Sequence, residues 1–442
     1  MRLKERPEDF VVTESYRFEK NPNGAYRVYL MDKQKLSTFA AVERICERFD
    51  LPASAVSYCG LKDKQGRTAQ LIAVRGVNVD MQEPDLRLKF LGRTDHPLTA
   101  ANTTSNRFSV TVRDLTDDEV ARLPEAVAEV RRLGVVNYFD SQRFGSLKHG
   151  QGFIAKDLIR GDFETALKNL IARPSELDRS NDSKVKAFFR DHWKEIAKVR
   201  SPFPEARRYQ PVLDHLRSHP GDFRGAFLRV ETRYRALQLF AYQSYLWNEC
   251  VRSFLLTAAA GETFLMLPYQ AGTLLFPRSL RPALLARLRK MTFPLLAPDS
   301  RFEDREVRQS VERVLAHEKM DLASLRVPDT PEMFFRHEER PVLVFPGKLV
   351  AGRAVSDPLH RGRRKLNVAF TLPPGAYATL VVRRLFHESF QRRRSGAESI
   401  AEPAAAEPES AFEKRREQGF LERQRSKKAA KQARRAAANL RR

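Results

Sequence analysis

The chain has 442 residues, a formal net charge of +24 and a pI of about 10.2. It is long enough for two or three domains, and 42% hydrophobic residues, with 29 Phe, can fill substantial cores. The charge predicts a polyanionic partner, first nucleic acid and second an anionic membrane surface. Because no apolar run approaches the roughly 20 residues that cross a bilayer, we expect no membrane-spanning segment.

Cysteine, histidine and the first residues bear on compartment and metal binding. The sequence begins MRLKERPEDF, which lacks the apolar core of a signal peptide. The three cysteines, Cys46, Cys59 and Cys250, are odd in number and widely spaced. None of the nine histidines lies at metal-ligand spacing. We therefore expect a cytoplasmic protein with reduced cysteines, no disulfide framework and no metal site.

The first part of the chain has the patterns of a strand-rich domain. A helix is predicted from Thr38 to Phe49, capped by Ser37 and stopped by Pro52. Thr116 and Glu119 form a capping box that starts a second helix, which Gly134 can end. Strands are predicted at Phe10–Thr13, Ala25–Met31, Val56–Cys59, Leu71–Val74, Leu86–Arg93 and Phe108–Arg113.

The pattern then changes to helices and back to strands. Residues 153–336 are mostly of helical periodicity, most evidently over Gln238–Leu256, whose Phe240, Tyr242, Tyr245, Leu246 and Trp247 are predicted to be core. Residues 341–352 and 365–385 are dense in β-formers and are predicted to complete the first sheet. We therefore expect a discontinuous domain of residues 1–150 and 337–388 around an insertion of residues 151–336.

The last part, residues 389–442, is rich in Ala, Glu, Lys and Arg. It holds 15 basic and 7 acidic residues, so we expect a disordered tail, or one that is helical only on RNA. Removing its net +8 leaves +16 on the rest, so the basic character is not confined to the tail.

Two stretches carry candidate functional residues. In VSYCGLKDKQGRTAQ, Asp63 stands between Lys62 and Lys64 on a loop after a strand. Neighbouring cations favour an ionised acid, so Asp63 is a candidate catalytic carboxylate, although an ordinary solvated turn has the same pattern. In NYFDSQRFG, residues 137–145, aromatic rings interleave with amide and guanidinium groups. This favours stacking on RNA bases, and the alternative is that the rings are core.

These stretches resemble motifs of the TruD family of tRNA pseudouridine synthases. GLKDKQGRTAQ resembles its Gly-x-Lys-Asp-x-x-Ala-x-Thr-x-Gln signature, with Gly66 in place of Ala. NYFDSQRFG resembles Asn-Tyr-Phe-Gly-x-Gln-Arg-Phe-Gly, with Asp140 in place of Gly. KERPEDFVVTE, residues 4–14, resembles the opening motif, and residues 370–379 resemble the closing Phe-x-Leu-Pro-x-Gly-x-Tyr-Ala-Thr strand. Ser244 and Asn248 match the Ser-x-x-x-Asn region of the family's insertion domain.

The resemblance implies a fold and a set of site residues. The fold is α+β, a pseudouridine synthase domain with a mixed, mainly antiparallel sheet, interrupted by a mostly helical α/β insertion domain. Asp63 is then the catalytic nucleophile, Phe139 packs against the target base and Asn137 helps to hold Asp63. The remaining implied substrate-binding or supporting residues are Lys4, Glu14, Lys62, Gln142 and Arg143. If the family's Gly at position 140 has positive φ, Asp is among the few tolerable replacements.

The implied activity is isomerisation of uridine to pseudouridine in tRNA, at uridine 13 of the D arm. It needs no cofactor or metal, and neither a membrane nor an obligate protein partner is implied, so we expect a monomer. The sequence leaves open whether Asp63 attacks C6 or C1′ or removes the C2′ proton. Two alternatives stay open: a non-catalytic RNA-binding or chaperone-like protein, and another RNA enzyme such as a nuclease.

Overall fold

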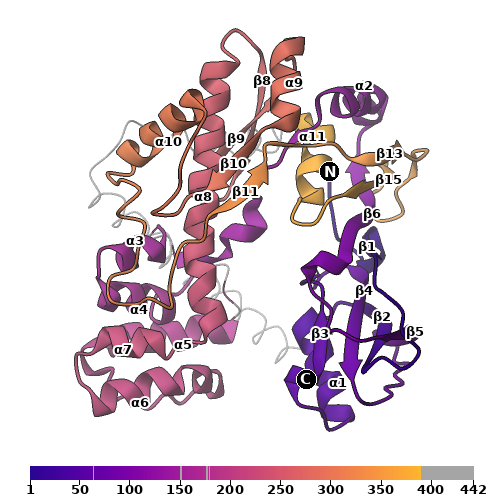
Figure 1. Ribbon diagram of the computed structural model, residues 1–442. Coiled ribbons are helices and arrows are strands. Elements are labelled where there is room, and N and C mark those ends of the chain that lie inside the picture. Colours follow the sequence, from indigo (N-terminus) through magenta and orange to yellow (C-terminus); the bar gives the residue numbers. More distant parts are fainter. Residues whose placement is uncertain (63, 150–151, 176–177, 179, 390–442) are drawn as a thin grey trace, which may run out of the picture. The chain divides into compact units, whose positions relative to one another are not determined.

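The computed structural model describes residues 1–389 except 63, 150–151, 176–177 and 179. Residues 1–390 form one compact unit (Figure 1). The predicted boundaries after residues 150 and 336 lie inside that unit, so the division into two domains stays a prediction. The predicted tail of residues 389–442 lies outside the described residues beyond Ser389.

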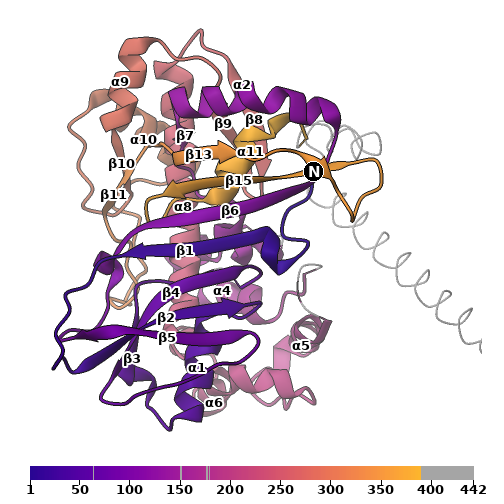
Figure 2. The ribbon, with the colours of Figure 1, turned by 90° about the vertical axis from the view of Figure 1, so that its right-hand side faces the viewer.

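A mixed sheet forms the strand-rich part of this unit. Its order is β13-β15-β6-β1-β4-β2-β5, with β14 paired to β15 and β3 to β4. The strands are β1 (Phe10–Tyr16), β2 (Tyr26–Gln34), β3 (Val56–Tyr58), β4 (Arg67–Arg75), β5 (Leu86–Thr94), β6 (Thr103–Leu115), β13 (Gly347–Ala351), β14 (Val355–Ser356) and β15 (Arg364–Leu372). Within the sheet, β1 and β4 run parallel and the other pairs are antiparallel. This confirms the predicted α+β class (Figure 2).

The late strands return to the early ones, as predicted. Strand β15 pairs antiparallel with β6, with Val368 opposite Val110, both fully buried. The prediction of strand from residue 365 to 385 is wrong beyond Leu372. Pro373 and Pro374 cannot donate to a ladder, and Gly375 turns the chain at φ +81. Residues 378–385 then form a helix, α11, because its apolar side chains pack into the core.

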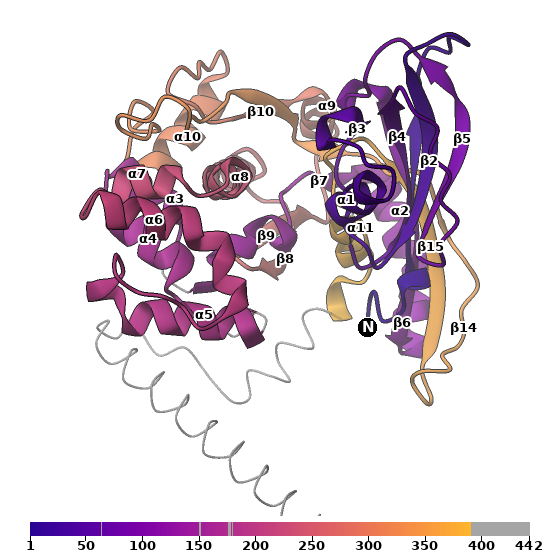
Figure 3. The same ribbon diagram turned by 90° about the horizontal axis from the view of Figure 1, so that it is seen from below.

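Three helices lie on one side of the sheet, which Figure 3 views nearly edge-on. They are α1 (Thr38–Arg48), α2 (Asp117–Leu133) and α11 (Ala378–Leu385). The predicted caps are confirmed: Ser37 Oγ accepts from the Ala40 amide at 3.0 Å, and Thr116 with Glu119 completes a capping box. Helix α2 ends at Gly134, whose φ is +73. Because α1 begins beside β4, its first residue can contact the loop that follows β3.

The rest of the unit is mainly helical, as predicted. Its helices are α3 (Ile154–Ile159), α4 (Phe163–Ile171), α5 (Ser180–Asp191), α6 (Gln210–Ser218), α7 (Phe223–Leu228), α8 (Thr232–Ala258), α9 (Pro282–Lys290) and α10 (Arg305–His317). Short ladders join β7 (Val135–Val136) to β12 (Leu343–Val344), β8 (Phe264–Tyr269) to β9 (Gly272–Pro277), and β10 (Thr292–Leu295) to β11 (Glu338–Pro341). The short 3-10 helices are η1 (Pro7–Asp9), η2 (Ala53–Ala55), η3 (Ala100–Asn102), η4 (Ser141–His149), η5 (Trp193–Glu195) and η6 (Pro204–Tyr209).

Helix α8, with 27 residues, is the longest helix in the described part of the chain. Tyr242, Leu246 and Trp247 are fully buried, as predicted for core residues. Phe240 is an exception, because its side chain is exposed. Helical periodicity predicts this helix as core but does not show which of its rings stays at the surface.

A buried ion triad joins three neighbouring segments of the sheet. The Arg113 guanidinium donates to Asp9 Oδ1 at 2.8 Å and to Asp357 Oδ1 at 2.9 Å, and all three side chains are buried. Burial alone would raise the pKa of Asp357, but hydrogen bonds from the Leu359 and Asp114 amides and from Arg113 lower it. Its partners in the triad and the two amides therefore favour the charged form of Asp357.

We expect Arg113→Met to lower the free energy of unfolding by about 3–5 kcal/mol, because it leaves two carboxylates buried without a counter-ion. Urea unfolding measures this. The control is Arg67→Gln, which removes an exposed pair with Asp32 and should cost no more than about 1 kcal/mol. A loss at position 113 as small as that of the control would contradict the importance of the triad.

Candidate active site

The loop that leads into position 63 is held by buried hydrogen bonds. Asp63 itself lies outside the described residues. The Lys62 amide donates to Thr38 Oγ1 at 3.1 Å, and Thr38 Oγ1 donates to Gln70 Oε1 at 2.9 Å. Gln70 Nε2 in turn donates to the Gly60 carbonyl at 3.0 Å. Thr38 and Gln70 are buried, so helix α1 and strand β4 fix the backbone directly before position 63.

Glu14 is the charged centre beneath this loop. Its carboxylate accepts from Lys62 Nζ at 2.6 Å, from Thr103 Oγ1 at 2.8 Å and from the Leu71 amide at 2.9 Å. The Glu14 side chain is fully buried and that of Lys62 is 10% exposed. Each carboxylate oxygen therefore has a hydrogen-bond donor, as expected for a buried polar group. Burial, with the Glu14 charge close by, also raises the pKa of Cys59 to about 11, which leaves that thiol unreactive.

Lys4 lies near the same end of the sheet. Its Nζ is 4.2 Å from the centre of the Phe10 ring, a cation–π distance, and its backbone has φ +58. Gly66 lies close to the same strand, since a Cβ at position 66 would be 2.3 Å from the Phe10 carbonyl oxygen. Alanine therefore does not fit this backbone, which accounts for Gly where the motif has Ala.

Phe139 lies in an aromatic cluster. Its ring contacts Trp247 and Tyr377 edge-on, at centroid distances of 5.7 and 6.2 Å, and is 4% exposed. The Asn248 side chain holds its backbone twice, accepting from the Phe139 amide at 2.8 Å and donating to its carbonyl at 2.9 Å. The sequence identified Asn248 of α8 only through the Ser-x-x-x-Asn motif. In the structure its side chain fixes the segment that carries Phe139.

Arg340 covers the face of the Phe139 ring. Its Cζ lies 4.1 Å from the ring centre, and that of Arg143 lies 5.4 Å away. Asn137 accepts from Arg340 through both its carbonyl and its Oδ1, each at 2.8 Å, and its Nδ2 donates to the Pro341 carbonyl. A base that stacks on Phe139 must therefore first displace Arg340. Sequence reasoning missed this arginine, which no motif includes.

Gln142 and Asp140 have different surroundings. Gln142 is exposed. Asp140 is buried, and its carboxylate pairs with Arg383 of α11 at 2.6 Å. Its backbone does not have positive φ, so the expectation based on a left-handed glycine does not apply. At this position the motif has Gly, which lacks a side chain, whereas Asp140 forms a buried ion pair with Arg383.

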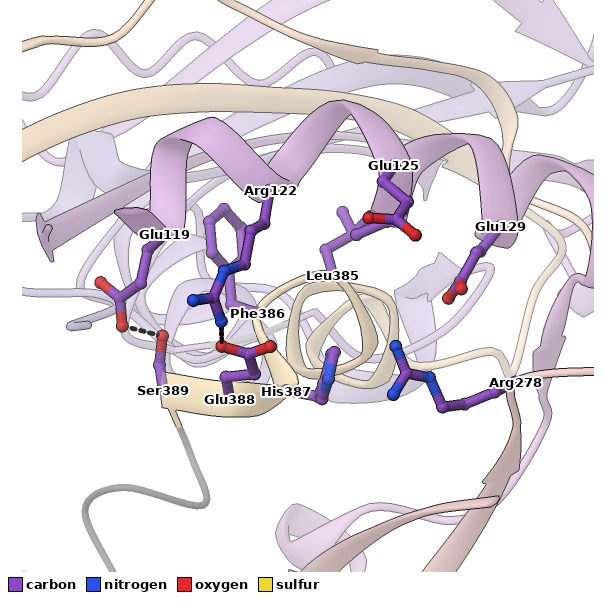
Figure 4. Close-up of a pocket in the computed structure, with 11 residues that line it drawn as sticks. Glu119, Arg122, Glu125, Glu129, Arg278, Leu385, Phe386, His387, Glu388 and Ser389 are labelled. Carbon is purple, nitrogen blue, oxygen red and sulfur yellow. Dashed lines mark hydrogen bonds and ion pairs between the residues drawn. The ribbon is translucent and has the colours of Figure 1, made fainter. Parts of the chain in front are cut away.

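A cavity of about 50 Å³ lies elsewhere, between α2 and the end of α11 (Figure 4). Its walls carry Glu119, Arg122, Glu125, Ala126, Glu129, Arg278, Leu385, Phe386, His387, Glu388 and Ser389. Within it, Arg122 pairs with Glu388, and Ser389 donates to Glu119. Burial, and then the charges of Arg384 and Arg278, lower the pKa of His387 to about 4. None of the motif residues lines this cavity, so it is not the predicted site.

In the described part of the chain, no group of three or more His, Cys, Asp or Glu side chains is placed to hold a metal ion. No helix among these residues has the length and apolar character needed to cross a bilayer.

The Glu14–Lys62 pair yields a stability test. We expect Glu14→Gln and Lys62→Met each to lower the free energy of unfolding by about 3–5 kcal/mol, because each leaves one buried charge unpaired. The double variant should lose less than the two single losses added together, as urea unfolding of all four proteins will show. Arg44→Gln, which breaks exposed pairs with Glu83 and Asp85, is the control. Strict additivity would mean that the pair carries no coupling.

His387 yields a pH test. Its folded pKa lies below the ordinary value of about 6.5, so between pH 6.5 and 4 only the unfolded chain takes up the proton. Stability should therefore fall as the pH falls through this window, and His387→Asn should remove part of that fall. His96 is exposed, so the control variant His96→Asn should leave the fall in stability unchanged. An NMR titration of folded protein in which His387 protonates near pH 6.5 would refute the expectation.

Comparisons with known proteins agree with the fold and with the motifs. Residues 1–385 match the family profile described as tRNA pseudouridine synthase D (TruD). The probable tRNA pseudouridine synthase D 2 of Methanocaldococcus jannaschii is 30% identical over 392 residues, 87% of this chain and 92% of that protein. The tRNA pseudouridine synthase D of Aquifex aeolicus is 28% identical over 393 residues, 87% of this chain and 98% of that protein.

A solved structure gives the same answer. It is the crystal structure of a candidate tRNA pseudouridine synthase D (TruD) from Methanosarcina mazei, with a TM-score of 0.64 and 25% identity. The match covers 87% of this chain and 93% of that one. With a family match over residues 1–385 and the same fold, this chain belongs to the TruD family and is a pseudouridine synthase, an isomerase.

Proposed function

We propose that this enzyme converts uridine to pseudouridine in tRNA, with Asp63 as the carboxylate that begins the reaction. The observation that carries the proposal is the buried support of the loop before position 63, where Thr38, Gln70 and the Glu14–Lys62 pair fix Gly60–Lys62. Catalysis by one carboxylate needs a loop held in one position, because a misplacement of about 1 Å costs on the order of 100-fold in rate.

The other motif residues take supporting or binding roles in this proposal. Glu14 and Lys62 neutralise each other, so their role is to support the loop and not to contact RNA directly. Lys4 packs on Phe10 beside them. Gln142 is exposed and Arg143 partly so, which leaves both accessible to substrate. For Asn137 and Phe139, contact with Asp63 and with the target base remains part of the proposal.

The reaction is balanced within the nucleotide. The N1–C1′ bond breaks, the base turns, and a C5–C1′ bond forms while the C5 proton is lost and N1 gains one. No electron leaves the substrate, so the chemistry does not call for a redox cofactor or ATP. Asp63 can begin it by attack at C6 or C1′, or by removing the C2′ proton, and the uridine must leave its stack in each case. A substantial positive charge favours binding of the RNA backbone.

We further propose that the target is uridine 13 in the D arm, and that the enzyme acts as a monomer in the cytoplasm. The family motifs support the first statement, and membership of a tRNA-modifying family is consistent with the last. The competing function is an RNA-binding or chaperone-like protein without turnover, for which the basic composition is equally suited.

The test is pseudouridine formation on an unmodified tRNA transcript, mapped by carbodiimide treatment and primer extension. Asp63→Asn should abolish the product while tRNA affinity stays within a few-fold of wild type, because phosphate contacts dominate affinity. The exposed Asp80 gives the matched control, Asp80→Asn, which should act like wild type. Wild-type protein that binds tRNA but forms no pseudouridine would favour the RNA-binding alternative, and product from Asp63→Asn would reject the role of Asp63.

A further inference from the structure

Two guanidinium groups converge on one buried ring without a carboxylate. Arg340 and Arg143 have their Cζ atoms 4.1 and 5.4 Å from the centre of the Phe139 ring. In the described part of the chain, neither forms an ion pair with Asp or Glu within 4.0 Å. Of the four buried arginines in the described part of the chain, three pair with carboxylates: Arg113 with Asp9 and Asp357, Arg383 with Asp140, and Arg384 with Glu129. The fourth, Arg235, donates to the Thr232 hydroxyl instead.

Arg340 is held only by uncharged oxygens. Its Nε and Nη2 donate to Asn137 O and Oδ1, and Nη2 also donates to the Gly375 carbonyl at 3.1 Å. Its Nη1 has no hydrogen-bonding partner among the residues that the structure describes. These contacts, with the Phe139 and Trp247 rings at 4.1 and 5.4 Å, fix the direction of the guanidinium without neutralising it.

Arg143 is even less engaged. Within the described chain its guanidinium makes no hydrogen bond, and its Nε is buried without a partner. Its backbone is fixed, since the Arg143 amide donates to the Asp140 carbonyl at 2.8 Å. The side chain therefore starts from a fixed backbone, and no described residue uses its guanidinium donors.

The two charges disfavour each other. Burial lowers the pKa of Arg340 to about 10. The nearby charge of Arg143 adds to that shift, while Tyr377 and Glu338 oppose it. Two partly buried cations that share one site cost free energy unless an anion joins them. Arginine forks suit phosphate oxygens in geometry as well as charge, whereas an uncharged uracil would leave the excess charge in place.

We propose that Arg143 and Arg340 together bind one phosphate group of the RNA, next to the nucleotide whose base is modified. This rests on the proposed function for the identity of the RNA. Binding the phosphate beside the target nucleotide would hold the backbone while the base leaves its stack.

The first test measures affinity for the tRNA transcript as salt is varied, for Arg143→Gln, Arg340→Gln and the double variant. Each single variant should bind roughly 10-fold more weakly at physiological salt and lower the slope of log affinity against log salt by about one. Arg143→Lys should restore most of that slope, since it keeps the charge. The matched control is Arg289→Gln, because exposed Arg289 also lies over a ring, with Cζ 4.2 Å from Phe345, outside this cluster.

The second test locates the phosphate. A transcript with one uncharged methylphosphonate linkage beside the modified uridine should bind wild type roughly 10-fold more weakly. The double variant should not distinguish it from the ordinary transcript. Salt slopes equal to wild type, or a methylphosphonate effect that persists in the double variant, would overturn the proposal.

Two further outcomes can be distinguished from loss of phosphate binding. If Arg340→Gln does not fold, Arg143→Gln still tests the proposal, because the Arg143 guanidinium makes no hydrogen bond within the described chain. Unchanged salt slopes with a lowered melting temperature would show that the arginines serve the fold alone, against the proposal. If wild type forms no pseudouridine while the slopes fall as expected, the proposed function fails and the phosphate site stands.

Discussion

A single buried carboxylate, Glu14, organises the end of the sheet on which catalysis is proposed to occur. Its two oxygens take one cation, one hydroxyl and one backbone amide, from Lys62, Thr103 and Leu71. These partners come from the loop before position 63, from strand β6 and from strand β4, so one side chain joins three segments. A buried charge is strongly destabilising when it loses a partner. Removing any one of these partners should therefore disturb the loop before position 63.

The aromatic cluster shows a second use of buried charge. Asn248 of α8 holds the backbone of Phe139, and the ring of Phe139 supports Arg340 from β11. The cluster thus joins the segment of residues 137–145 to residues about 100 and 200 positions later. The Glu14 charge is balanced by Lys62, whereas Arg340 has no carboxylate partner among the described residues. This difference distinguishes a charge that supports the fold from one that can bind a ligand. The same contrast applies to Arg383, which Asp140 neutralises.

Local pattern predicted much of the fold. The Ser37 cap, the capping box at Thr116 and the apolar run in β4 each depend on neighbours within a few residues, so sequence alone placed them. The strand predicted to reach Leu385 ends earlier. Val381 and Val382 are β-branched, which favours strand locally, but both are buried in helix α11, and the sequence does not show that packing. The prediction of Phe240 as a core residue was wrong as well. The sequence of an apolar helix does not show which face stays exposed.

The site was predicted in part. The motifs identified Glu14, Lys62 and Asn137 but not what they contact. Thr38 and Arg340 carry no local signal: Thr38 reads as the first residue of a helix, and Arg340 stands in a run of charged residues 203 positions from Asn137. Departures from the motifs have physical causes that only the fold supplies, such as the Phe10 carbonyl against Gly66.

The central claim is that Glu14 and its partners hold the residue at position 63 against the nucleotide to be modified. A crystal structure of Asp63→Asn bound to a uridine-containing tRNA tests it most directly. The account predicts the side chain at position 63 within about 3.5 Å of the unstacked uridine, with Lys62 still on Glu14. A uridine bound away from position 63, or a loop that has left Glu14 in the complex, would contradict it.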